Sequence, residues 1–382
     1  MSRASVVAGL LLVPVVVQAQ PRAVTLGKAN ARAREVLSLV TSVRELKNGD
    51  LMVADPIERK LMVFGASLQS MRALGKEGGG PGEYRQPDGV WPMPGDSTMV
   101  VDLGNARLSI VSPAGVYARS MPMASGGAGG PVGVMFPGGI DAQGRIYFQP
   151  NAGGPGASLD SANVMRLDPK GGAPQPVAKV KLPDLDRQES GSENQRSVRI
   201  RPIPLSASDG WAVAPNGDVA VARSGTYRID WVSNGTARVG APVAVTRARI
   251  GEAEKKEWVQ QQMLNGGISV QVEDNNGQRS MTFGRSRPQQ EPSTEGYKWP
   301  ATKPPFDAAS LRVDPTGRVW VRRLGPANSP RLYDVFNAAG AHVGTVTFPS
   351  DRVLLGFGAS SLYAAEVDAD GQYVLERYAL PL

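Results

Sequence analysis

The stretch Lys47-Asn-Gly-Asp-Leu-Met-Val-Ala-Asp55 joins a tight-turn tetrapeptide to a short apolar strand that ends in a polar residue. A second strand, Arg59-Lys-Leu-Met-Val-Phe64, follows it at once. The first arrangement returns with different letters at residues 94–102, 142–150, 215–223 and 315–323, and more loosely at 358–366. Repetition of one unit along a chain indicates identical sheet modules that stack or close into a ring.

The second copy shows what one module contains. Apolar strands are expected at 89–93, 98–101, 108–111 and 116–119, joined by the turn 94–97, the loop 102–107 and the turn 112–115. This is a four-stranded antiparallel meander of about 40 residues, the size of one β-propeller blade. The 45 glycines and 31 prolines of the 382-residue chain fit many turns rather than long helices. An all-β ring is therefore predicted.

The run Gly75-Lys-Glu-Gly-Gly-Gly-Pro-Gly-Glu-Tyr-Arg-Gln-Pro87, together with the two stretches quoted above, resembles the six-bladed β-propellers of the NHL-repeat type. The resemblance implies six four-stranded antiparallel blades around one axis. It also implies a role as a binding platform or scaffold, or in some members as a metal-dependent hydrolase or lyase, so the fold alone does not name the function. We expect residues 23–26 to add a strand to blade six and close the ring.

The first residues have the pattern of a bacterial export signal. Arg3 supplies a positive start, residues 6–17 an apolar run, and Val17-Gln-Ala19 a small-residue cleavage site. The alternative is a buried N-terminal strand. The chain has no cysteine, hence neither a lipid-anchor cysteine nor a disulfide. We expect a signal peptide at 1–19 and one propeller domain at 20–382, periplasmic or extracellular, without a membrane span and monomeric.

Loop lengths predict which face of the ring binds a ligand. The turns between the first and second strands of each blade are minimal, whereas the crossovers between blades are long on the other face, as at 183–208 and 247–307. Binding residues collect on variable loops held by a rigid scaffold, so we expect the ligand on the long-loop face. Within the insertion 247–307, residues 251–264 are expected to form a helix, which either caps the ring or packs on its rim.

A net charge of +7 and many arginines near the long loops favour an anionic ligand, although interspersed acids fit a solvated surface equally well. A peptide, a glycan or a partner protein would suit such a face; nucleic acid is not expected without a basic-aromatic module. The candidate ligand-binding residues are Arg85, Arg107, Arg223, Arg322, Arg323 and Glu83.

Catalytic signals are poor. His342 is the only histidine, and we expect it at the surface of the short-turn face. A single histidine at that position excludes histidine-based catalytic triads and multi-histidine zinc sites. Residues 75–82 lack the following helix of a phosphate loop, and Asp368-Ala-Asp-Gly371 reads as a hairpin turn rather than a calcium loop. No cofactor is expected. A weak calcium alternative, implied by the resemblance to propeller lactonases, would use Glu83, Asp102, Asn105 and Asp314.

Two functional classes follow: a non-enzymatic binding or scaffold propeller, and an oxygen-ligated metal hydrolase or lyase. A central cluster of Asp, Glu and Asn side chains would favour the second class. Arginines and aromatic residues that line the mouth would favour the first, which we prefer.

Overall fold

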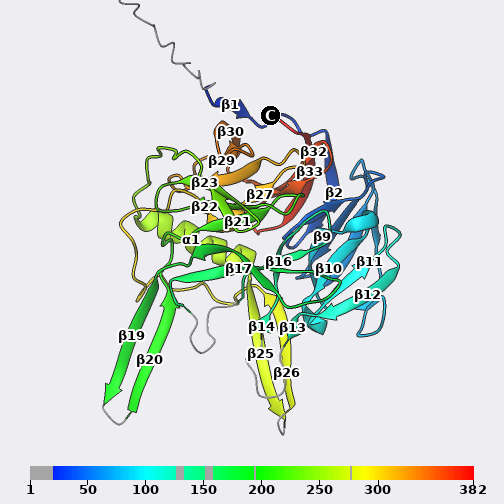
Figure 1. Cartoon of the computed structure of the whole chain (residues 1–382), viewed down its shortest axis with the longest axis horizontal. Helices are drawn as coiled ribbons and strands as arrows, with labels where there is room; N and C mark the ends of the chain where they lie inside the picture. The colour runs from blue at the N-terminus through cyan, green and yellow to red at the C-terminus, as the bar shows by residue number, and fades with distance from the viewer. Residues whose placement is uncertain (1–19, 126–132, 151–157, 193–194, 276–277) are drawn as a thin grey trace, which may run out of the picture.

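The computed structural model describes residues 20–125, 133–150, 158–192, 195–275 and 278–382. The predicted signal peptide at 1–19 lies outside these residues. The chain forms a six-bladed β-propeller of four-stranded antiparallel sheets (Figure 1), as the repeated units predicted.

The strands of each blade run from the central axis outward. Blades one and two contain β3 (Val43–Glu45), β4 (Leu51–Asp55), β5 (Lys60–Phe64) and β6 (Met71–Ala73), then β9 (Pro87–Pro92), β10 (Thr98–Asp102), β11 (Arg107–Val111) and β12 (Tyr117–Pro122). Blades three and four contain β15 (Pro137–Ile140), β16 (Ile146–Phe148), β17 (Ser161–Leu167) and β18 (Gln175–Lys181), then β21 (Gly210–Val213), β22 (Val219–Arg223), β23 (Arg228–Ser233) and β24 (Thr236–Arg238).

The last two blades take strands from the N-terminal segment. Blade five contains β27 (Arg312–Val313), β28 (Val319–Arg323), β29 (Arg331–Phe336), β30 (His342–Phe348) and, as a fifth strand, β1 (Arg22–Thr25). Blade six contains β31 (Arg352–Phe357), β32 (Ser361–Val367), β33 (Tyr373–Ala379) and β2 (Ala31–Leu37).

The repeated tetrapeptides form the turns between the first two strands of the blades. In blade five, Asp314 accepts hydrogen bonds from the backbone N–H groups of Thr316 and Arg318, and Gly317 adopts φ +81°. Glycine reaches this left-handed region without steric strain, so the turn closes tightly. Asp314 also accepts from the indole N–H of Trp320 on the next strand, which ties the turn to the blade interior.

Apolar packing between adjacent blades holds the ring together. Among the described residues, six clusters of buried side chains each lie at one blade–blade boundary. The boundary between blades six and one joins Tyr363 and Leu375 to Val53 and Phe64, all at most 1% exposed. Such burial is the main stabilising term in a chain without cysteines.

An N-terminal strand closes the ring, but it is not the segment that the sequence predicted. Residues 23–26 do not join blade six; β1 pairs in parallel with β30 of blade five. The outer strand of blade six is β2, antiparallel to β33. The physical reason is that blade six has only three strands of its own, and β2 offers Ala33 and Leu37 to its boundary with blade one.

The crossovers carry additional elements. The predicted helix is present as α1 (Glu252–Asn265). Two long hairpins were not predicted, β19 (Leu185–Ser192) with β20 (Gln195–Pro202) and β25 (Gly267–Asn275) with β26 (Gln278–Ser286). Figure 1 shows both hairpins projecting from the same side of the propeller. Shorter pairs, β7 (Lys76–Glu77) with β8 (Glu83–Tyr84) and β13 (Ala124–Ser125) with β14 (Gly133–Val134), flank blade two.

Candidate functional site

A central channel of about 1160 Å³ runs along the propeller axis. The innermost strand of every blade contributes to its wall, from β3 to β31. Lining residues come from the short turns at one end, such as Lys47 and Pro315, and from the crossover side at the other, such as Asp88 and Asp209. The channel therefore extends from the short-turn face to the long-loop face.

Aromatic side chains from four blades line the channel, namely Trp91, Phe136, Trp211 and Phe357. The indole N–H of Trp211 donates to Gln149, 3.3 Å away. A Cβ on Gly138 would lie 2.5 Å from the Trp211 ring, so only glycine leaves room for the ring in this position. The four rings thus border the channel while they also pack against the clusters between blades.

Charged side chains complete the wall. Arg44 Nη2 lies 2.6 Å from Asp96 Oδ1, both on the short-turn half of the channel. Glu45 accepts a hydrogen bond from Tyr363 at 2.5 Å, and burial together with this bond raises the pKa of the Tyr363 hydroxyl. Arg312 differs from these residues, because among the described residues its guanidinium donates to backbone carbonyls and to no side chain.

The hairpin β25–β26 crosses the long-loop end of the channel. Gln86 of blade two and the backbone of Arg285 exchange two hydrogen bonds of 2.8 and 3.0 Å. The Arg285 guanidinium pairs with Asp88, and Ile268 lines the channel. Phe283 is 2% exposed and packs among the side chains between blades two and three. The base of the hairpin is therefore fixed to blade two at the rim of the mouth.

Helix α1 lies on the rim rather than over the axis. The Glu254 carboxylate accepts from the Ala327 N–H of blade five at 3.0 Å. At the C-terminal end of α1, Arg287 donates to the carbonyl of Leu264 and also to the carbonyl of Gly371 in blade six. Helix α1 thus bridges blades five and six and does not cap the channel.

Three of the predicted site residues lie together in blade two. Arg107 donates to the carbonyls of Gly79, Gly80 and Glu83 and so fixes the glycine-rich loop. Glu83 accepts from the Gly80 N–H at 2.7 Å, and this bond, followed by the nearby Lys76, lowers the pKa of Glu83. Arg85 is exposed, and no ion pair of its side chain occurs among the described residues.

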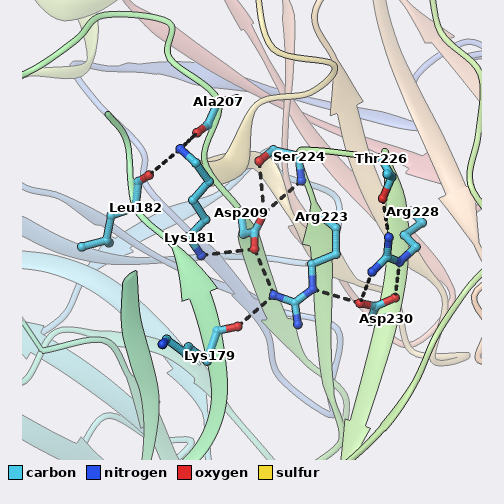
Figure 2. Close-up of polar contacts among 10 residues, drawn as sticks. All are labelled: Lys179, Lys181, Leu182, Ala207, Asp209, Arg223, Ser224, Thr226, Arg228 and Asp230. Atoms are coloured by element: carbon cyan, nitrogen blue, oxygen red, sulfur yellow. Dashed lines mark hydrogen bonds and ion pairs between the residues drawn. The ribbon is translucent and has the colours of Figure 1, made fainter. Parts of the chain in front are cut away.

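Arg223 lies within a polar network between blades three and four. Figure 2 shows its guanidinium between Asp209 and Asp230, at 2.9 Å from each. It also donates to the Lys179 carbonyl. Asp209 in turn accepts from Ser224, so the network ties the start of blade four to its second strand.

Arg322 and Arg323 point to opposite faces of β28. Arg323 donates to Asp334 on the face toward blade four, where the Tyr227 hydroxyl donates to the same carboxylate. Arg322 pairs with Asp307 at 2.9 Å on the other face. Consecutive residues of a strand alternate in direction, so these two side chains do not converge.

The four candidate calcium ligands do not form one cluster. Asn105 donates to Asp102 at 2.7 Å, and both lie near Glu83 in the loops of blade two. Asp314 lies in a short turn of blade five, saturated by its own turn and by Trp320. Within the described ranges, no group of three or more His, Cys, Asp or Glu side chains is arranged to hold a metal ion.

His342 is not a surface residue, contrary to the expectation. Its side chain is 14% exposed, packs against Phe336 with ring centroids 5.3 Å apart, and lies 3.4 Å from Asp334. The reason is that His342 begins β30, and its side chain lies on the face that carries Asp334. Asp368 accepts from the N–H groups of Asp370 and Gln372, which confirms the predicted hairpin turn.

No protein-family model matches the sequence, and no curated protein sequence matches it. Solved structures share the architecture. A member of the DUF4221 family from Bacteroides vulgatus is 10% identical with a TM-score of 0.49, covering 96% of this chain and 98% of its own. A gluconolactonase from Xanthomonas campestris is 13% identical with a TM-score of 0.44, covering 95% and 99%. Virginiamycin B lyase from Staphylococcus aureus is 9% identical with a TM-score of 0.38, covering 90% and 81%.

At sequence identities this low, the similarity concerns the fold alone. The three structures are two enzymes and a member of a family without a stated activity. In the part of the chain that the structure describes, no helix is long and apolar enough to cross a membrane.

Proposed function

We propose that this protein is an exported, monomeric binding or scaffold propeller that holds its ligand in the central channel, reached from the long-loop face. The observation that carries the proposal is the channel wall, where four aromatic side chains stand among charged side chains of both signs, such as the pairs Arg44 with Asp96 and Arg285 with Asp88. At about 1160 Å³ the channel slightly exceeds the range of about 300–1,000 Å³ that is usual for small-ligand sites. A short glycan or an extended peptide fits this mixture of aromatic and charged groups.

The aromatic residues provide the stacking surface. Sugar rings and the side chains of aromatic residues or proline bind flat aromatic faces by apolar contact and polarisable ring electrons. Trp211 is held in one orientation by Gln149 and by the space that Gly138 leaves. A preorganised ring loses little entropy when a ligand binds.

The test is a binding screen of the purified protein against acidic oligosaccharides and short acidic peptides by isothermal titration calorimetry. Trp211→Ala should weaken binding by roughly tenfold or more, since loss of a stacked aromatic contact is worth about 1–3 kcal/mol. Tyr117→Ala removes a partly exposed ring on the outer strand of blade two and should leave the affinity unchanged.

Two results would contradict the proposal. Equal losses of affinity in Trp211→Ala and Tyr117→Ala would place the ligand outside the channel. Binding or hydrolysis abolished by a chelator, and restored by calcium, would support the lactonase-like alternative. The NHL-type assignment stays a prediction from the glycine-rich run of blade two.

A further inference from the structure

One face of blade five carries three arginines on three adjacent strands. Arg312 pairs in register with Trp320, and Arg322 pairs with Tyr333. Arg331 lies two residues before Tyr333 on the same strand. Because side chains alternate along strands, all three arginines share the face of Trp320 and Tyr333, and these two rings pack in the boundary between blades five and six.

The hydrogen bonds of these guanidinium groups are mostly to backbone carbonyls. Arg312 donates to Ala309 and Leu311 at 3.1 and 2.9 Å, and Arg331 donates to Ser350 at 2.8 Å. Arg322 pairs with Asp307, but its buried Nε has no hydrogen-bond partner among the described residues. A buried charged donor without an acceptor is unfavourable, so this N–H group is available to the oxygen of an anion.

The surrounding charges leave the cluster positive. Helix α1 lies above it, where Glu257 pairs with the 2% exposed Lys303 at 2.6 Å. The Glu254 carboxylate of the same helix also acts on Lys303. Asp307, Glu254 and Glu257 thus face four cationic groups, the three arginines and Lys303, which leaves an excess of one positive charge.

The neighbouring charged groups do not compensate this excess. From blade six, Arg352 pairs with carboxylates of its own, Asp351, Glu366 and Glu376. From the insertion, Arg287 donates only to carbonyls, and Arg285 pairs with Asp88. Burial lowers the pKa of Arg312 and of Arg331, and for Arg331 the neighbouring Arg322 lowers it further.

We propose that Arg312, Arg322 and Arg331 bind a phosphate or sulfate group, whose negative charge balances the excess and whose oxygens accept from the guanidinium N–H groups. Planar guanidinium groups recognise such oxyanions through paired N–H donors. Arg312 also lines the channel together with Phe357 of blade six, so the anion reaches the cluster from the channel. The inference rests on the proposed function in one respect. If the bound phosphate or sulfate is not a free ion, it is part of the ligand that the channel holds.

The experiment measures the melting temperature of the purified protein in chloride, in inorganic phosphate, in sulfate and in glucose 6-phosphate, at equal ionic strength. The native protein should melt about 2–4 °C higher in the oxyanions than in chloride, because a bound ligand stabilises the folded state. The variant with Arg312→Gln and Arg331→Gln should lose this difference. It should also melt at a higher temperature than the native protein in chloride, since two partly buried charges without a carboxylate partner among the described residues are gone.

Arg323→Gln is the matched control, because Arg323 is the neighbour of Arg322 but points toward blade four. It should lower the melting temperature in every buffer and keep the full oxyanion difference. Sulfate and phosphate stabilise proteins in general, so the readout is the difference between variants. If the double variant does not fold, the two single variants carry the comparison.

An equal response to inorganic phosphate and to glucose 6-phosphate supports a site for the free anion, and a larger response to the ester supports a group on a larger ligand. The proposal would be overturned if oxyanions raised the melting temperature by the same amount in the native protein, in the double variant with Arg312→Gln and Arg331→Gln, and in Arg323→Gln. That result would leave the channel function standing, since binding of an uncharged glycan through Trp211 does not depend on these arginines.

Discussion

Blades four and five each bury an aspartate carboxylate that pairs with an arginine at the end of the adjacent strand. Arg223 ends β22 and pairs with Asp230 on the adjacent strand β23, and Arg323 ends β28 and pairs with Asp334 on β29. Asp334 is fully buried and also accepts from Tyr227 of blade four and from Thr345. Burial alone would raise the pKa of Asp334, but hydrogen bonding from His342, the charge of Arg323 and the other donors outweigh it and lower the pKa.

Asp334→Asn should destabilise the protein at neutral pH by about 3–5 kcal/mol, because it removes the buried member of the ion pair and leaves the partly buried Arg323 without its counterion. The folded-state pKa of Asp334 lies below its unfolded value, so its stabilisation is present above the unfolded pKa of about 3.9 and is lost as the pH falls through the folded pKa. Urea unfolding at pH 7 and at pH 3 should therefore show a smaller difference between the native protein and the variant at pH 3.

Asp370→Asn is the control, since Asp370 lies exposed in the turn before β33. Its effect should be within about 0.5 kcal/mol at either pH, as for most surface substitutions. A loss in Asp334→Asn that did not change between the two pH values would contradict the ionic role of Asp334.

Single residues show what the sequence could and could not predict. The opposite directions of Arg322 and Arg323 follow from strand alternation, so their failure to converge was predictable from the strand assignment. The pairing of Arg223 with Asp209 was not, because Asp209 belongs to a crossover whose path depends on the packing of two blades. Trp91 and Trp211 fall in predicted inner strands, but only the ring geometry places them on one channel.

At the scale of elements, the closing strand decides the stability of the ring. β2 supplies the outer strand of blade six and buries Ala33 and Leu37, whereas β1 extends a blade that already has four strands. Both segments alternate in sequence, so their local pattern does not distinguish which of them closes the ring. Because blade six supplies three strands of its own, it needs β2 as its fourth strand.

Removal of residues 20–30 should lower the free energy of unfolding by about 1.5–3 kcal/mol, mainly through loss of the buried Leu26 side chain. Leu37→Asp, which leaves the chain length unchanged, should have a larger effect, because it places a charge in the boundary between blades six and one. Chemical denaturation of both variants measures which of them loses more free energy of unfolding. A truncation more harmful than Leu37→Asp would show that β1 is the closing element.

The hairpin β25–β26 was missed although the sequence holds a signal for it. Ile268, Val270 and Val272 alternate with polar residues before Asn276-Gly277, a dipeptide typical of tight hairpin turns. The polar composition of the segment after residue 274 obscured this alternation. The helix α1 was predictable because good helix formers follow each other over its full length.

Phe283→Ala should detach the hairpin from the propeller, since loss of a buried phenylalanine costs about 3–5 kcal/mol. Limited proteolysis should then cut within residues 267–286 while the blades stay intact. Met281→Ala, a partly buried neighbour in the same cluster, should increase cleavage less. Unchanged resistance of Phe283→Ala would mean that the bonds of Gln86 alone hold the hairpin.

At the scale of the whole molecule, export stays a prediction from residues outside the described structure. We expect cleavage after Ala19 and a mature protein that starts at Gln20. N-terminal sequencing of protein recovered from the periplasm or the medium tests this, and Ala19→Arg should block the cleavage. A mature protein that still begins at Met1 or Ser2 would contradict it.

The pairing of β2 with β33 also sets an order of events during biosynthesis. Ala31 lies opposite Arg377, so a strand near the start of the chain waits for nearly the last strand before it can pair. Contacts between such distant parts form late, because closing a long loop is entropically unfavourable. On a chain that emerges from the ribosome or the translocon with its N-terminus first, β2 stays unpaired while the blades assemble one after another, and the apolar face of blade one that packs on blade six stays exposed. Unpaired edges recruit other chains, so the interval before closure is the period when this protein is most prone to aggregation and most in need of a chaperone.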